Sequence, residues 1–143
     1  MRQINQREII LLKPDFTKYS LALVQGDKII YSSDDSGLKP LCDCLEKYRQ
    51  SKDKFILFDK VIGFAAARIV VYSGIIEAIQ TKLISQPAKQ CLKENKIKIE
   101  ADEIVANILR KDKSAVCPGE IIALNTDDQH VFLAKIAAMI SRS

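Results

Sequence analysis

The sequence has little of the residues that mark several common classes of protein. It has no Trp, one His (His130), four Tyr and five Phe. A surface that stacks nucleic-acid bases would therefore have few candidate side chains. The 22 basic residues are nearly balanced by 18 acidic ones, and no basic cluster alternates with aromatic residues. A nucleic-acid partner is thus not indicated.

Long apolar runs are also absent. No stretch approaches the roughly 20 apolar residues that cross a bilayer, so no membrane partner is expected. Because residues 1–8 are polar, we expect no signal peptide and a cytoplasmic location. The chain has 143 residues, of which 48% are hydrophobic and 28% charged, without a repeat or a linker. This composition predicts one globular domain over residues 1–143 and leaves a homo-oligomer open.

Four cysteines are present, at Cys42, Cys44, Cys91 and Cys117. In a cytoplasmic protein they are expected to be reduced. No CxxC pair or histidine cluster accompanies them, and Cys42 and Cys44 point to different faces of a predicted helix. We therefore expect no metal and no other cofactor.

The hydrophobic pattern predicts strands that alternate with helices. Residues 20–25 and 28–33 are expected to form a hairpin, because Gly26-Asp27 suits a type II′ turn. Helices are expected at residues 38–48, 63–72, 87–93 (or 87–96) and 127–140, and strands at 55–58, 79–84 and 97–100. A short helix or strand is expected at residues 9–12, and a helical or irregular segment at 102–109. Strand–helix alternation favours parallel pairing. The fold class expected is a three-layer α/β/α sandwich around a mixed sheet of about five strands.

One strand-to-helix junction is the best candidate site. Asp59, Lys60 and Gly63 follow the apolar strand at residues 55–58 and precede a helix that begins with three alanines. Ligands of open α/β sheets bind at the carboxyl ends of strands. A lysine there suits a phosphate or a carboxylate, helped by the helix N-terminus. The alternative is an acid that caps the helix beside a solvated lysine.

Four further residues are candidates for the same edge of the sheet. Ser85 and Gln86 precede Pro87 at the next helix start, where they act as a helix cap, as ligand groups, or as both. Cys117 is a nucleophile only if a base such as His130 lies nearby. Glu120 is the best remaining general base.

Several segments carry a family resemblance. Residues 37–41, 59–67, 84–88 and 117–120 are similar to a prokaryotic domain-of-unknown-function family, of the family 1893 type, within the cytidine-deaminase-like superfamily. The resemblance implies a deaminase-like fold, with the two zinc motifs placed at the helix starts near residues 59–63 and 87–91. The first motif here has no His, Cys or Glu, and Ala88 stands where the second requires its first Cys. Only Cys91 remains in register, as a lone ligand or as a core residue, so zinc-dependent deamination is not expected.

Two functions from different classes remain. The first is a deaminase-fold protein without a zinc centre that binds a small polar or anionic ligand through Asp59, Lys60 and Ser85, with Gln86, Cys117 and Glu120 nearby. The second is a non-catalytic protein-interaction module. Side chains that converge in a concavity favour the first, and side chains splayed into solvent favour the second.

Overall fold

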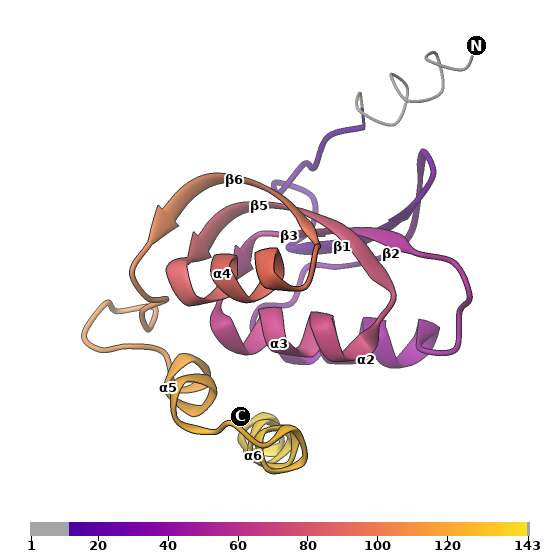
Figure 1. The fold of residues 1–143 in the computed structure, drawn as a ribbon. Helices are drawn as coiled ribbons and strands as arrows, with labels where there is room; N and C mark the ends of the chain where they lie inside the picture. Colours follow the sequence, from indigo (N-terminus) through magenta and orange to yellow (C-terminus); the bar gives the residue numbers. More distant parts are fainter. Residues whose placement is uncertain (1–11, 143) are drawn as a thin grey trace.

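The computed structural model describes residues 12–142, which form a mixed six-stranded sheet and five helices (Figure 1). The elements are β1 (Leu21–Gln25), β2 (Lys28–Ser33), α2 (Lys39–Tyr48), β3 (Phe55–Asp59), β4 (Val61–Ile62), α3 (Phe64–Ser73), β5 (Ile76–Ser85), α4 (Gln86–Glu94), β6 (Lys98–Val105), α5 (Pro118–Asn125) and α6 (Gln129–Ser141). The element expected at residues 9–12 lies almost wholly outside the described residues. No helix within residues 12–142 has both the length and the apolarity to cross a membrane.

The predicted hairpin is confirmed. β1 and β2 pair antiparallel, and Gln25 lies opposite Lys28. Gly26 has φ +64°, the left-handed conformation that a tight hairpin turn requires and that glycine adopts readily. β1 also pairs antiparallel with β3, and β3 pairs parallel with β5. The hairpin therefore forms one edge of a sheet whose other strands run parallel.

A short break divides one sheet strand into β3 and β4. Phe58 pairs with Gln80 and Val61 pairs with Leu83, so the register across the break is unchanged. At the break, the Thr81 hydroxyl donates to the Lys60 carbonyl over 3.2 Å. The sequence prediction placed a junction here and missed β4. The break leaves Asp59 and Lys60 at the carboxyl end of β3, where their side chains are not confined within a continuous ladder.

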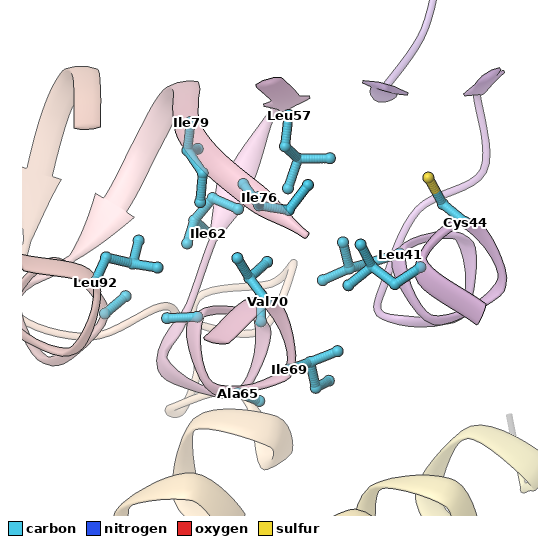
Figure 2. Packing of buried hydrophobic residues seen from close by; sticks show 14 of the residues in the cluster. Leu41, Cys44, Leu57, Ile62, Ala65, Ile69, Val70, Ile76, Ile79 and Leu92 are labelled. Atoms are coloured by element: carbon cyan, nitrogen blue, oxygen red, sulfur yellow. The ribbon is translucent and has the colours of Figure 1, made fainter. Parts of the chain in front are cut away.

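The helices lie in two layers on one face of the sheet. α2, α3 and α4 lie side by side against the strands, and α5 and α6 cover the outer side of α3 (Figures 1 and 2). Side chains from the strands and from these three helices meet in one core, including Leu57, Val70 and Leu92 (Figure 2). On the opposite face, residues such as Phe16 cover a smaller cluster around Phe58. The predicted α/β fold around a mixed sheet is confirmed, and the arrangement is consistent with a three-layer sandwich, although all five described helices lie on one side.

One sequence expectation after residue 97 is wrong, and one helix was not expected. The segment at residues 102–105 is not helical or irregular but completes β6, which pairs with β5 as far as Val105. The sequence did not predict this part of the strand, because the adjacent acids Asp102 and Glu103 break the alternation of polar and apolar residues. The unexpected helix is α5, which has Pro118 in its first position, where proline is well tolerated. The last helix, α6, is confirmed, and the Asp128 carboxylate caps it by accepting from Val131 N.

A buried arginine fastens α5 and α6 to α3. Arg68, in α3, is only 7% exposed, and its guanidinium lies 4.0 Å from the centre of the Phe132 ring in α6. It donates to the carbonyls of Ala123 and Asp127 over 3.0 and 3.1 Å, to the carbonyl of Thr126, and to the Tyr72 hydroxyl. These carbonyls lie at the C-terminal end of α5, which favours a positive charge. The charge is therefore stabilised by carbonyl dipoles and aromatic rings, with no ion pair to a carboxylate among residues 12–142.

We expect Arg68→Met to lower the free energy of unfolding by at least about 3 kcal/mol, because it leaves several buried carbonyls without a donor. Amide hydrogen exchange should show the largest loss of protection in α5 and α6. Arg142→Met, which removes an exposed arginine, is the matched control and should change the stability by less than about 0.5 kcal/mol. Equal effects of the two substitutions would contradict the role assigned to Arg68. Unfolding in urea, followed by circular dichroism, measures both.

Candidate functional site

A cavity of about 360 Å³ lies at the carboxyl end of β3 and β4. Its walls come from the segment that leads into α2, from the first turn of α3, from the loop after β6 and from the start of α5. The apolar wall includes Leu38, Pro40, Ala65, Ala66 and Ile108. The small alanines of α3 leave this space open. Cavities of this size accept small molecules.

Asp59 supplies a carboxyl group within this cavity. Its side chain is partly buried, and burial raises its pKa to about 8, although the backbone amides of Val61 and Lys60 partly oppose the shift. At neutral pH the group is thus mostly protonated and can donate a hydrogen bond as well as accept one. Burial also raises the pKa of the Cys44 thiol to about 12, and the charge of Asp59 adds to this shift. Cys44 therefore stays a neutral thiol in the core.

The mouth of the cavity is mainly basic. Lys60, Arg110 and Lys111 line it and are exposed, and the exposed acid Asp35 also lines it. Lys60 also lines a second depression, beside residues 13–17 on the other face of the sheet. Lys60 can therefore reach a ligand in the cavity, but its side chain is not fixed there.

Glu120 joins three segments at the inner end of the cavity. Its side chain is 2% exposed. One carboxylate oxygen accepts from Phe64 N, the first residue of α3, and from the Ser85 hydroxyl over 3.4 Å. The other oxygen accepts from Ile108 N over 2.9 Å. The negative charge that a helix N-terminus favours is thus supplied by the protein itself, and Glu120 has a structural role that the sequence did not reveal.

Gly63 makes this contact possible. It is the N-cap residue of α3 and has no side chain to cap the helix. A Cβ at this position would lie 3.0 Å from a Glu120 carboxylate oxygen and 3.1 Å from Ile108 Cγ1. The φ of Gly63 is −90°, which any residue adopts. Space, and not backbone conformation, is therefore what requires glycine here.

The remaining candidates are divided between the cavity and its surroundings. Cys117 lines the cavity beside Asp59, Lys60 and Glu120. Ser85 is fully buried, caps α4 by accepting from Ala88 N over 3.3 Å, and touches the cavity only through Glu120. Gln86 is exposed at the start of α4 and does not line the cavity. The structure thus brings together four of the six candidates, with Ser85 behind them and Gln86 outside.

The cysteines and the histidine do not form a reactive or metal-binding group. His130 is exposed in the first turn of α6 and does not line the cavity that holds Cys117. Cys91 lies in a separate depression between α3 and α4, and burial raises the pKa of its thiol. Throughout residues 12–142, no three His, Cys, Asp or Glu side chains are grouped to hold a metal ion.

The residues that line the cavity but were not indicated by the sequence include Asp35, Leu38, Arg110 and Lys111. Two of them belong to the polar loop after β6, whose basic residues were visible in the sequence. Nothing in the local pattern showed that this loop returns to the end of β3. The isolated bridge between Leu109 and Val116 closes the loop and turns it toward the cavity.

The raised pKa of Asp59 predicts that stability depends on pH. The folded protein holds a proton on Asp59 up to about pH 8, whereas the unfolded chain releases it near pH 4. The free energy of unfolding should therefore fall as the pH rises from about 4 to about 8, by at most about 1.4 kcal/mol per pH unit. Asp59→Asn should remove this fall and be more stable than the wild type at pH 9 by at least about 2 kcal/mol. Urea unfolding at pH 5 and pH 9 measures the difference.

Asp112→Asn is the matched control for this pH series. Asp112 is exposed, and hydrogen bonds from Ser114 lower its pKa below the usual value. Its substitution should leave the slope between pH 5 and pH 9 unchanged. A wild-type protein with no such slope would contradict the burial of Asp59.

Glu120 and Gly63 are expected to be coupled. Glu120→Ala should cost about 2–4 kcal/mol, because it removes the cap of α3 and leaves buried amides unpaired. Gly63→Ser should destabilise the wild type by about 1–3 kcal/mol through its close contact with Glu120. In the Glu120→Ala background, the same serine can cap the helix itself and should restore part of the loss. A double-mutant cycle measured by urea unfolding tests this change of sign, and additive effects would exclude it.

Comparison with known proteins agrees with this architecture. No curated protein is significantly similar to this chain. The crystal structure of a DUF1893 family protein (TM1506) from Thermotoga maritima is similar to the chain, with 26% sequence identity and a TM-score of 0.74, and the similarity covers 97% of this chain and 92% of that one. The sequence profile described as TM1506, domain of unknown function (DUF1893), matches residues 12–140. The chain therefore belongs to the DUF1893 family.

Proposed function

We propose that the protein binds a small polar or anionic molecule in the cavity at the carboxyl end of β3 and β4. The observation that carries this proposal is Asp59, a partly buried carboxyl group within a largely apolar cavity of about 360 Å³. Binding sites in proteins commonly combine apolar walls with a few convergent polar groups. Lys60 and the other bases at the mouth suit a negative charge on the ligand.

The free-energy cost of keeping the carboxyl group of Asp59 away from water supports the same proposal. Burial raises the pKa of this group to about 8, so its ionised form destabilises the fold. An asparagine or an apolar side chain would avoid this cost. Groups with strongly shifted pKa values are concentrated at functional sites, where a particular protonation state is needed. Asp59 is therefore assigned the role of the inner hydrogen-bonding group for the ligand.

We also propose that the chain is a member of the cytidine-deaminase-like superfamily and that its site does not use zinc. Its support is the order of an antiparallel hairpin, parallel strands, and helices that begin at Phe64 and Gln86. The residues at those helix starts are Gly63 and Ala88 where the superfamily motifs need metal ligands. The function proposed for the site is therefore ligand binding, with no reaction assigned to it.

A ligand screen tests the proposal. Nucleotides, nucleosides, sugar phosphates and amino acids should be compared by thermal shift, since a ligand at 100 times its Kd stabilises by about 2.7 kcal/mol. Lys60→Ala and Asp59→Asn should weaken the binding of a hit roughly tenfold or more. Lys60→Ala should change the unfolding free energy by less than about 0.5 kcal/mol.

Lys82→Ala is the matched control, because Lys82 is an exposed lysine on β5 outside the cavity. It should leave the affinity of the hit unchanged. Unchanged affinities in Lys60→Ala and Asp59→Asn would reject the cavity as the binding site.

A protein-interaction module is the second candidate, and one observation favours it. α5 and α6 expose Ile121, Leu124, Val131 and Leu133, each 36–47% accessible to solvent. Large apolar side chains exposed on two neighbouring helices are candidates for contact with a partner. Under this alternative, Leu124→Glu should abolish an association detected by light scattering while ligand screens stay negative.

A further inference from the structure

The cavity is chemically different at its two ends. Its interior is bounded by Leu38, Pro40, Ala65 and Ala66, on the first turns of α2 and α3. These side chains offer no hydrogen bonds, and the carboxyl groups of Asp59 and Glu120 line the cavity beside them. Arg110 and Lys111 line the mouth on the loop after β6 and are exposed. A molecule that satisfies both ends must be apolar along most of its length and anionic at one end.

The exposed charges that line the cavity favour an anionic ligand. Three exposed cations line it (Lys60, Arg110 and Lys111), against one exposed carboxylate, Asp35. The buried Glu120 carboxylate already accepts from Phe64 N, Ser85 and Ile108 N, so it does not compete for the bases at the mouth. A negative charge on the ligand would complement these bases.

We propose that the ligand is an amphiphilic anion, whose apolar body lies between α2 and α3 and whose carboxylate or phosphate group binds Arg110 and Lys111 at the mouth. This inference rests on the proposed function of the cavity and adds the class and the orientation of its ligand. Guanidinium and ammonium groups bind such oxyanions through charge-assisted hydrogen bonds. The loop after β6 is therefore assigned as the element that selects for charge.

Matched small probes test the inference. Benzoate and phenyl phosphate carry the anion on an aromatic ring, and benzamide is the neutral counterpart of benzoate. Amide shifts in nitrogen-15 NMR spectra locate and measure their binding at pH 7. Benzoate or phenyl phosphate should shift the amides of Gly63, Ala65 and Ala66 and bind roughly tenfold more tightly than benzamide. The better of the two anions identifies the headgroup.

Substitution of Arg110 and Lys111 tests whether their charge causes the preference for anionic probes over a neutral probe of similar shape. In Arg110→Gln/Lys111→Gln, the anions should bind no better than benzamide, and benzamide should bind as it does to the wild type. Lys52→Gln/Lys93→Gln makes the same change of charge at exposed residues outside the cavity and should preserve the preference for anions.

The outcomes distinguish this inference from the function on which it rests. Equal binding of benzoate and benzamide, with both probes shifting the amides of Gly63, Ala65 and Ala66, would support the cavity as a binding site and overturn the anionic class. If the preference for anions persists in Arg110→Gln/Lys111→Gln, the anionic group of the ligand does not bind these two residues, and the proposed orientation of the ligand is wrong. Failure of all three probes to shift the cavity amides would overturn the amphiphilic class, while the broader thermal-shift screen would still decide the proposed function.

Discussion

The carboxylate of Glu120 is the contact on which the architecture of the site depends. It accepts from the first amide of α3, from the Ser85 hydroxyl at the start of α4 and from Ile108 in the loop after β6. Each of these segments borders or supports the cavity. A buried carboxylate with several donors is stable only while those donors stay in place. Glu120 therefore fixes the inner end of the cavity without being available to act as a general base.

The contacts between α3 and α5 run in both directions. Glu120, in the first turn of α5, caps the N-terminus of α3, and Arg68, in α3, binds carbonyls at the C-terminal end of α5. Each helix thus supplies the charged side chain that the opposite end of its partner favours. This exchange holds the outer helical layer against α3. It also engages the charged groups of both residues in contacts within the protein.

The sequence predicted most of the sheet but less of the site, for physical reasons. The hairpin, β3, β5 and α6 follow from local signals: the Gly26 turn, apolar runs, and Asp128 as a cap. β4 and the end of β6 depend on pairing with β5, which residues 61–62 and 102–105 do not reveal by themselves. Asp59 and Lys60 could be located because strand ends define an edge. The role of Glu120 could not, because its partner Phe64 is 56 residues away and only the folded chain brings them together.

The distance in sequence between Gly63 and Glu120 has a consequence for how the chain is made. During synthesis the N-terminal part of a protein emerges first, so the sheet and α3 can assemble while α5 is still unmade. Until then, the first turn of α3 has no cap and the apolar side of this helix faces solvent. Contacts between residues far apart in sequence form late. The nascent protein therefore passes through a stage in which the cavity is open on one side, and synthesis of α5 closes it.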